Sequence, residues 1–179
     1  MKYNIIRKPE WLKIKIPSGE NVSHLRDLIV NNRLNTVCSD AKCPNKGECW
    51  DKLTATFMIL GNYCTRNCAF CAVATGKPLS VDFEEPRRVA DAVSKLGLKY
   101  SVITSVTRDD IEDGGAEIYA ITIFAIKEKV PECKVEVLIP DFKGERKSLE
   151  TVIDAKPDVI SHNMEAVKKL YKTVRPQAK

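Results

Sequence analysis

Six of the seven cysteines of this 179-residue chain lie in a single stretch of the sequence. They form two groups, the first triad (Cys38, Cys43 and Cys49) and the second triad (Cys64, Cys68 and Cys71). An odd number of cysteines excludes complete pairing into intramolecular disulfides, and the total is well below the roughly 8–10% found in small disulfide scaffolds. The clustering therefore predicts metal ligation in a reducing compartment.

The second triad has the spacing C-x3-C-x2-C and lies in a polar loop expected over residues 62–76. Three thiolates this close along a loop can be directed at one metal centre. A [4Fe–4S] cluster usually takes four thiolates, so three leave one iron open to a small molecule, as catalytic metal sites generally do. The alternatives are a zinc site completed by a histidine or a distant cysteine, and a set of free cysteines. The spacing and the polar neighbours favour the cluster.

The first triad has the spacing C-x4-C-x5-C and lies in a second polar loop, expected over residues 35–52. Taken alone it suits zinc or another iron–sulfur cluster, because soft thiolates bind both. Unligated reactive cysteines are the remaining alternative. We expect Lys42 and Lys46 to offset the negative charge of the thiolates and lower their pKa values. Cys133 stands alone and is expected to be a packing residue.

Four strand–helix units are predicted after the first triad, because apolar runs alternate with helical stripes. The expected strands are 55–60, 100–104, 135–139 and 158–161, and the expected helices are 85–96, 113–129, a short one capped by Ser148, and 164–171. An earlier helix is expected from Ser23, as its N-cap, to about Arg33. Repeated strand–helix units imply parallel strands joined by right-handed crossovers.

The residues that could do chemistry follow the strands, which is the side on which barrel-type sheets carry their active sites. A Rossmann-type sheet is less favoured, because no G-x-G-x-x-G follows any strand. We therefore expect an α/β fold, a partial TIM-type barrel of about four βα units with an N-terminal extension that carries the first triad. Four units leave sheet edges open, so we also expect either a fragment or another polypeptide that completes the barrel.

Bulk composition excludes several classes of protein. A content of 44% hydrophobic and 30% charged residues is typical of a globular chain. No stretch approaches the roughly 18 apolar residues of a membrane span, and the N-terminus lacks the apolar run of a signal peptide. The net charge of +5 permits an acidic partner, but scattered lysines and arginines favour neither nucleic acid nor a membrane as a partner. The expected compartment is the cytoplasm.

A phenylalanine, Phe70, precedes the last cysteine of the second triad. This motif resembles that of the radical S-adenosylmethionine superfamily, and the first triad narrows the resemblance to the lipoyl synthase family. The resemblance covers nearly the whole chain and includes Cys43-Pro-Asn-Lys-Gly-Glu-Cys49-Trp50, Thr56-Phe-Met-Ile-Leu-Gly61, Thr104-Ser-Val-Thr-Arg-Asp-Asp110, Asp113-Gly-Gly-Ala116, Glu136-Val-Leu-Ile-Pro140 and Val174-Arg-Pro-Gln-Ala178.

The resemblance implies two [4Fe–4S] clusters and S-adenosylmethionine as cofactors. The cluster on Cys64, Cys68 and Cys71 would bind S-adenosylmethionine and cleave it to methionine and a 5′-deoxyadenosyl radical. The auxiliary cluster on Cys38, Cys43 and Cys49 would donate sulfur to C6 and C8 of a protein-bound octanoyl chain. The implied domain division is an extension over residues 1–52 and an incomplete radical core over residues 53–179.

The resemblance also implies partners and an enzyme class. The enzyme would be a sulfurtransferase acting on octanoylated lipoyl carrier proteins, namely 2-oxoacid dehydrogenase E2 subunits and the glycine cleavage H protein. An electron donor such as ferredoxin or flavodoxin would serve the radical cluster. Five residues after the second strand are expected to help bind S-adenosylmethionine: Arg108, Asp109, Asp113, Gly114 and Gly115. The alternative for them is a helix cap with surface charges. His162 and Asn163 are expected either to face the cavity or to be structural.

The sequence departs from the family in two respects. The family's auxiliary cluster takes a fourth ligand, a serine, from an Arg-Ser-Ser motif near the C-terminus, and no Arg-Ser-Ser occurs in these 179 residues. The family chain also continues past the segment that ends at Ala178. We therefore expect a truncated lipoyl synthase. The alternatives are an inactive or split fragment that binds a cluster, and a different radical enzyme of the superfamily.

Overall fold

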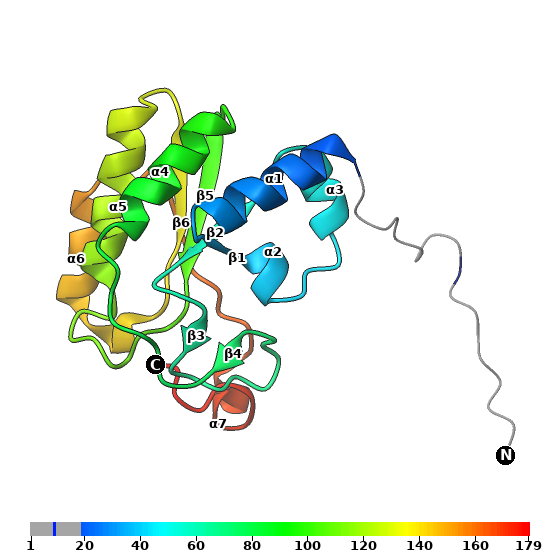
Figure 1. The fold of residues 1–179 in the computed structure, drawn as a ribbon. Helices are drawn as coiled ribbons and strands as arrows, with labels where there is room; N and C mark the ends of the chain where they lie inside the picture. Colours follow the sequence, from blue (N-terminus) through cyan, green and yellow to red (C-terminus); the bar gives the residue numbers. More distant parts are fainter. Residues whose placement is uncertain (1–8, 10–18) are drawn as a thin grey trace, which may run out of the picture.

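The computed structural model describes residue 9 and residues 19–179 (Figure 1). Most of the first eighteen residues of the predicted extension, 1–8 and 10–18, therefore lie outside the described residues. The described chain forms a mostly parallel sheet with helices on it, a separate two-stranded sheet, and a group of helices from the N-terminal part beside them (Figure 1). Among the described residues, no helix is long and apolar enough to cross a membrane.

The main sheet has five strands in the order β1-β2-β5-β6-β7. Four of them run parallel and match the predicted strands: β2 (Thr56–Ile59), β5 (Tyr100–Ser105), β6 (Lys134–Leu138) and β7 (Val159–Ser161). Consecutive parallel strands in sequential order confirm the predicted α/β fold and are consistent with part of a TIM-type barrel. The fifth strand, β1 (Asn35–Thr36), pairs antiparallel with β2 and was not predicted. A strand of two polar residues is too short to show the hydrophobic alternation by which strands are predicted.

Three helices cover one face of the sheet: α4 (Glu85–Lys95), α5 (Ala116–Lys129) and α6 (Arg146–Asp154) (Figure 1). They follow β2, β5 and β6 in turn, as the crossover rule predicts. The core combines alternate strand residues such as Ile103, Val135 and Val137 with helix residues such as Val93 and Ile123, all fully buried. These layers fix where the ends of the strands, and the loops that follow them, lie.

The N-terminal part contains α1 (Glu20–Asn31), α2 (Val37–Asp40) and α3 (Lys46–Asp51). The predicted N-cap of the first helix was wrong, because α1 begins three residues before Ser23, whose N–H donates to the carbonyl of Gly19. The predicted loop over residues 35–52 was also wrong. Local capping folds it, since Thr36 Oγ1 accepts the N–H of Ser39 and the Asp40 carboxylate accepts the N–H of Thr36.

Two predictions about later helices need correction. Helix α6 begins at Arg146 with Glu145 as its N-cap, so Ser148 is a buried residue inside the helix rather than its cap. The helix expected over residues 164–171 is instead a 3-10 turn, η3 (Lys168–Leu170), followed by one turn, α7 (Tyr171–Val174). The backbone leaves the helical region at Glu165, whose φ is 59°, and the Arg175 guanidinium donates to the carbonyl oxygens of Asn163 and Met164 at 3.0 Å each. Another short turn, η2 (Phe142–Gly144), follows β6.

Candidate metal and cofactor site

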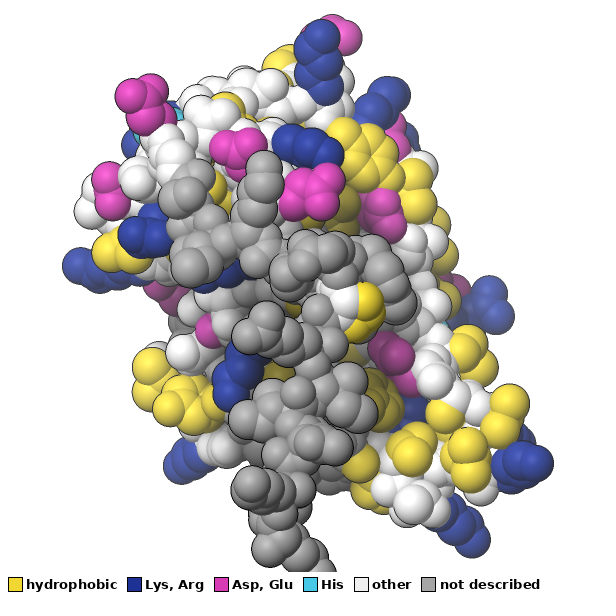
Figure 2. Space-filling view, turned by 90° about the vertical axis from the view of Figure 1, so that its right-hand side faces the viewer, with side chains coloured by type: hydrophobic (Ala, Val, Ile, Leu, Met, Phe, Trp, Pro, Cys, Tyr) yellow, Lys and Arg dark blue, Asp and Glu magenta, His cyan; other side chains and the backbone are white. Residues whose placement is uncertain are grey.

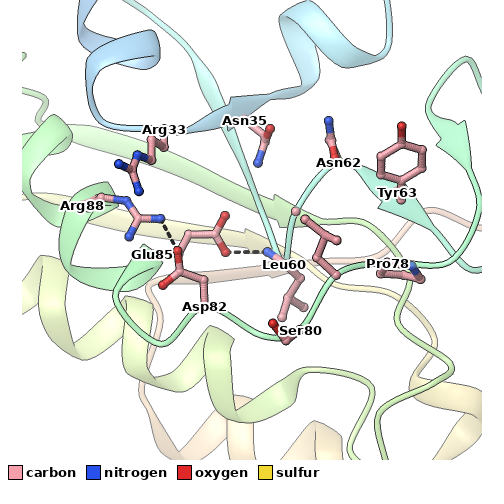
Figure 3. Close-up of a pocket in the computed structure, with 12 residues that line it drawn as sticks. Arg33, Asn35, Leu60, Asn62, Tyr63, Pro78, Ser80, Asp82, Glu85 and Arg88 are labelled. Atoms are coloured by element: carbon pink, nitrogen blue, oxygen red, sulfur yellow. Dashed lines mark hydrogen bonds and ion pairs between the residues drawn. The ribbon is translucent and has the colours of Figure 1, made fainter.

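The second triad begins at a sharp corner after β2. Leu60 and Gly61 both have positive φ, 69° and 89°, so the chain turns there. The Leu60 N–H donates to the buried Glu85 carboxylate at 2.7 Å, and Figure 3 shows this bond beside a cavity of about 200 Å³. Burial raises the pKa of Glu85, and the bond from Leu60 partly offsets that rise. The first turn of α4 thus supports the start of the cysteine loop.

The cysteine loop follows β2 in the chain but is attached by hydrogen bonds to the end of β5. It contains two very short paired strands, β3 (Tyr63–Cys64) and β4 (Ala74–Thr75), within the loop that was expected over residues 62–76. Thr65 binds this end of the sheet three times: its N–H and hydroxyl donate to the Thr107 carbonyl, and its hydroxyl accepts the Asp109 N–H. The residue next to the first cysteine is therefore fixed to the sheet.

Arg66 forms the strongest link between the loop and the sheet. Its guanidinium donates two hydrogen bonds to Asp109 (2.7 and 2.9 Å) and two to Asp141 (both 2.7 Å). The side chains of Arg66 and Asp141 are only 3% and 4% exposed. Burial disfavours the charge on Asp141, but the bonds from Arg66, together with those from the N–H groups of Lys179 and Lys143, outweigh it and lower its pKa to about 2. Because Asp109 and Asp141 follow β5 and β6, this bidentate clamp fastens the cysteine loop across two strand ends.

The chain after β7 also contacts the cysteine loop, near Ala69. The Ala69 N–H donates to the Val174 carbonyl at 2.9 Å. The next residue, Arg175, is buried and lies near Cys68. Burial raises the pKa of the Cys68 thiol, the Arg175 charge opposes that rise, and the thiols of Cys64 and Cys71 add to it. The thiols of the second triad are therefore close enough to influence one another electrostatically, and the buried Arg175 cation acts on Cys68.

A cavity of about 140 Å³ lies at the carboxyl ends of β5, β6 and β7. Its lining is mainly polar and comprises Thr104, Ser105, Thr107, Leu138, Ile139, Pro140, His162, Asn163, Glu165 and Arg175. Among the described residues, Arg175 Nε has no hydrogen-bond partner although it is buried. The Nδ1 atom of His162 lies 2.9 Å from the Ile139 carbonyl, so this histidine is both structural and cavity-lining. The cavity offers a buried cation and carbonyl, hydroxyl, amide and carboxylate oxygens to a polar ligand.

The residues expected to contact S-adenosylmethionine make structural contacts in this conformation. Arg108 is buried and donates to Asp110, Leu60 and Leu79, which braces the β2 corner. Asp109 belongs to the Arg66 clamp. Asp113 caps α5 by accepting the N–H groups of Gly115 and Glu117. Their contact with the cofactor stays a prediction.

The paired glycines at the start of α5 are needed for close packing. Both have positive φ, 64° at Gly114 and 91° at Gly115. A Cβ at Gly115 would lie 2.2 Å from Leu60 Cδ1, and one at Gly114 would lie 3.0 Å from Phe142 Cδ1. The glycines thus let the start of α5 lie directly against the corner that leads into the cysteine loop.

The first triad lies on and beside α2 and α3. Burial raises the pKa of the Cys49 thiol, and the neighbouring thiols of Cys38 and Cys43 raise it further. The expected lowering of the thiol pKa was wrong for Cys49, because burial dominates and Lys52 offsets it only in part. Lys46 instead stacks 4.1 Å over the Trp50 ring and donates to Ser39 Oγ. The chain around this triad is held mainly by local bonds, such as that from the Cys43 N–H to the Cys38 carbonyl.

The donor set fits two iron–sulfur clusters. All six triad cysteines are free thiols, and in each triad the thiols are close enough to shift a neighbour's pKa. Among the described residues, no three Cys, His, Asp or Glu side chains converge on a single-ion site. A [4Fe–4S] cluster usually takes four thiolates, so the three thiols of each triad leave one iron for another ligand. Soft thiolates are the donors that such clusters use.

Several residues of this site escaped the sequence analysis. Arg66, Glu85 and Arg175 are buried ionisable groups within or beside the cysteine loop. In the sequence, a charged residue between two cysteines does not indicate burial, because most arginines in loops are exposed to solvent. Asp141 could have indicated the role of Arg66. It comes two residues after the expected end of a strand, on the side where barrels carry their sites, so it is placed to bind a cation there.

Two family models match the chain. The Radical SAM superfamily matches residues 58–178, and the N-terminal domain of lipoyl synthase of the Radical SAM family matches residues 1–43. The first match spans the parallel sheet and the second triad. The second match ends at the middle cysteine of the first triad.

Curated relatives resemble the chain along almost its whole length. A lipoyl synthase of Rubrobacter xylanophilus is 58% identical over 96% of this chain, and one of Caldanaerobacter subterraneus is 57% identical over 97%. A lipoyl synthase of Chloroflexus aggregans is 54% identical over 97%. The matched regions cover 54%, 60% and 56% of those relatives, so the chain spans little more than half of their length.

Proposed function

The chain belongs to the radical SAM superfamily and within it to the lipoyl synthases. From this premise we propose that it takes part in sulfur insertion at C6 and C8 of a protein-bound octanoyl group. The observation that carries the proposal is the second triad, fastened by Arg66 over the carboxyl ends of parallel strands. Active sites of barrel-type sheets lie on that side. The chain spans only part of its relatives, so the complete reaction is proposed for the lipoyl synthase to which it corresponds.

Within this proposal, Cys64, Cys68 and Cys71 hold the cluster that binds S-adenosylmethionine. When bound, the cluster supplies one electron for reductive cleavage of the sulfonium, which is chemistry that protein side chains cannot supply. The protein orients the cofactor. Arg175, buried with its Nε unpaired among the described residues, suits a carboxylate, and Glu165 suits an ammonium or ribose hydroxyl in the same cavity.

The contacts of the charged segment after β5 suggest how it contributes. We place Arg108 and Asp109 behind the cofactor, as residues that fix the β2 corner and the Arg66 clamp. The turn formed by Asp113, Gly114 and Gly115 remains a proposed contact, because the start of α5 presents backbone N–H groups to an anion. These roles predict that Arg108 and Asp109 variants lose cluster content before they lose cofactor affinity.

We assign the auxiliary cluster, the sulfur donor, to Cys38, Cys43 and Cys49, and we keep the division into an extension (1–52) and a radical core (53–179). The proposed partners are octanoylated lipoyl carrier proteins and a protein electron donor, with a further polypeptide segment supplying the remaining cluster ligand. Six free triad thiols suit a reducing compartment, which supports the cytoplasm as the place of action.

A second candidate function is a radical site without sulfur donation. It is favoured by one observation: the first triad is held mainly by local bonds, whereas the second is fastened to the sheet by Arg66. In that case the chain would cleave S-adenosylmethionine but leave the octanoyl chain unthiolated.

Anaerobic reconstitution with iron and sulfide separates the candidates. About eight irons and eight labile sulfides per chain are expected for two clusters, and about four of each for the radical site alone. Single turnover with an octanoylated carrier domain then tests the donor: 5′-deoxyadenosine without thiolated product supports the second candidate. Zinc uptake without labile sulfide would contradict both candidates.

A further inference from the structure

The first turn of α4 contacts the chain just ahead of both cysteine triads. Glu85 and Arg88 are three residues apart, so their side chains lie on one face of the helix, and both line the cavity of about 200 Å³ in Figure 3. Glu85 accepts the Leu60 N–H, four residues before the first cysteine of the second triad. Arg88 Nε donates to the Asn32 carbonyl at 2.9 Å, six residues before the first cysteine of the first triad. One helical turn thus holds the entry to each triad.

Arg88 is directed at the N-terminal part by a second partner. Its guanidinium also donates to the Asp82 carboxylate at 2.7 Å, which Figure 3 shows as a dashed line. Asp82 is itself fixed at the start of α4, because its carboxylate accepts the Glu84 N–H and its carbonyl accepts the Glu85 N–H. The bond from Arg88 lowers the pKa of Asp82, so the pair stays charged. The Arg88 side chain is only 19% exposed, and its direction toward Asn32 is therefore fixed.

The Asn32 carbonyl lies at a turn that needs support. It comes directly after α1, where the last carbonyl groups of a helix lack partners within the helix and favour a cation. The next residue, Arg33, has a φ of 50°, in the left-handed region that a residue other than glycine adopts only when other contacts hold it. The Arg88 guanidinium supplies a partner for the carbonyl, a cation for the helix end and a restraint on the turn.

The position of the first triad depends on the end of α1. The turn after α1 leads into β1, which pairs with β2 through two residues. Helix α1 is also bonded to α3, the helix that carries Cys49, because the Asn21 side-chain amide donates to the Asp51 carbonyl at 2.7 Å. Figure 2 shows acidic and basic side chains interspersed in the upper part of the face that carries α1 and α3 (Figure 1), so specific contacts rather than a field of one sign position this part. A displacement at Asn32 therefore shifts both ends of the first triad.

We infer that Arg88 is a positioning residue that sets the distance between the two triads. Its bond to Asn32 places the first triad, and Glu85 on the same turn places the second. The inference rests on the proposed function, in which the radical forms at the second triad and the sulfur comes from the first. One carbon of the octanoyl chain must then reach both sites, and a misplacement of about 1 Å lowers such a rate by up to about 100-fold. Loss of Arg88 should therefore impair sulfur insertion more than cofactor cleavage, because the chain that Arg88 holds leads to the first triad.

The variant Arg88→Ala tests the inference, and Arg87→Ala, a change of the neighbouring arginine on α4, is the matched control. Arg87 is exposed and pairs with Glu84, so its loss leaves the bond to Asn32 in place. Arg88→Lys keeps a charged donor at the same position and serves as the rescue. Each chain is reconstituted anaerobically, its iron is counted, and circular dichroism verifies that it is folded.

Two measurements use the loaded chain. Pulsed electron paramagnetic resonance of the two reduced clusters gives the distribution of distances between them, which should shift or broaden by at least about 1 Å in Arg88→Ala. Single turnover with an octanoylated carrier domain gives the 5′-deoxyadenosine formed per thiolated product, which should rise at least about tenfold. Arg87→Ala should match wild type in both measurements, and Arg88→Lys should recover most of the loss.

A third measurement needs no cluster. The Leu34 N–H donates to the Ile29 carbonyl across the turn, so its hydrogen exchange reports whether the turn is held. In the unloaded Arg88→Ala chain this exchange should be at least about tenfold faster than in wild type, since a bond from a charged donor has been lost. Arg87→Ala should leave the exchange rate unchanged.

The outcomes separate the two failures. If wild type does not load two clusters, the proposed sulfur insertion fails, and hydrogen exchange alone then decides whether Arg88 holds the turn. Unchanged exchange, or unchanged distances and product ratio, in Arg88→Ala overturns the inference. A proportional loss of S-adenosylmethionine cleavage and thiolation also overturns it, because Arg88 would then support the whole fold rather than the placement of one triad.

Discussion

The two cysteine segments are held in place by different forces. The first triad lies on short helices closed by local bonds, such as the cap that Thr36 makes with Ser39, three residues away. The second triad lies in a loop fixed by residues far along the chain, since Arg66 reaches Asp109 and Asp141 at separations of 43 and 75 residues. One site is therefore shaped by its own sequence and the other by the sheet.

This difference suggests a division of labour between the two sites. A group that must hold a cofactor in one orientation benefits from rigid support by the strand ends, because small displacements lower catalysis strongly. The site that we propose as the sulfur donor need not hold a cofactor in one orientation, so local bonds suffice there. We expect changes at the clamp to harm the second site and changes at the local caps to harm the first.

The largest effect on stability is expected from breaking the clamp. Arg66→Ala leaves two carboxylates at the loop without their partner, and removing one member of a buried ion pair costs about 3–5 kcal/mol. Urea unfolding of the unloaded chain measures the loss. Arg87→Ala is the matched control, because its ion pair with Glu84 is exposed and is worth about 0–1 kcal/mol. Equal losses in the two variants would contradict the claim that the sheet holds the second segment.

Acid should weaken the same clamp. The pKa of Asp141 is lowered to about 2 in the folded chain, below its ordinary value of 3.8. A lowered acid pKa stabilises the fold fully above the ordinary value, and this contribution is lost as the pH falls from about 4 through about 2. Asp141→Asn should be less stable than wild type at pH 5, and its stability should fall less steeply below pH 4.

Urea midpoints measured between pH 5 and pH 2 test this expectation. The matched control is Asp154→Asn, which removes an exposed carboxylate that has no ion pair among the described residues. A wild-type slope in the Asp141→Asn variant would show that the clamp carries no acid sensitivity.

A smaller effect is expected where α5 meets the corner before the cysteine loop. Gly115→Ala puts a Cβ 2.2 Å from Leu60 Cδ1 in a position with positive φ. Overpacking of this kind costs about 1–3 kcal/mol beyond the backbone strain. Gly61→Ala is matched in φ but meets no atom within 4 Å, so it reports the strain alone. If thermal melting shows equal losses for both, Leu60 is not held against α5.

The smallest effect concerns the local cap of the first segment. Thr36→Ala removes the hydroxyl that accepts the Ser39 N–H at 3.3 Å, and loss of such a cap costs about 1 kcal/mol. After reconstitution, the variant should lose iron mainly from the first triad and keep the second. Thr36→Ser retains the hydroxyl and serves as the control. A loss of iron from the second triad instead would mean that the two segments are coupled.

The parallel sheet was predictable because its strands are continuous apolar runs, such as residues 55–60, and its helices carry apolar stripes. The cysteine spacing likewise indicated the metal chemistry. Strand β1 and helices α2 and α3 were not predictable, because they are too short to show a period. Hydrogen bonds of Thr36 and Asp40 set the start of α2, and α3 has no side-chain cap. The turn at residues 164–171 escaped prediction because a sequence pattern shows neither the positive φ of Glu165 nor the bonds from Arg175 to the carbonyl oxygens of Asn163 and Met164.

The Arg66 clamp at the candidate site could not be predicted from the sequence, for a different reason. Arg66 reads as a solvated loop residue, and only the folded sheet brings Asp109 and Asp141 to opposite sides of it. The predicted cofactor residues Arg108 and Asp113 were found at the expected end of the sheet, but with structural partners. Sequence spacing located the site, whereas long-range pairing decided which residues support it.

The central claim is that the two triads hold two clusters with separate roles. Cys68→Ala and Cys43→Ala, each reconstituted anaerobically, are assayed for 5′-deoxyadenosine after reduction by dithionite. The account predicts that Cys68→Ala forms none, and that Cys43→Ala forms it at a rate close to wild type while giving no thiolated product. Loss of S-adenosylmethionine cleavage in Cys43→Ala, or its survival in Cys68→Ala, would contradict the assignment.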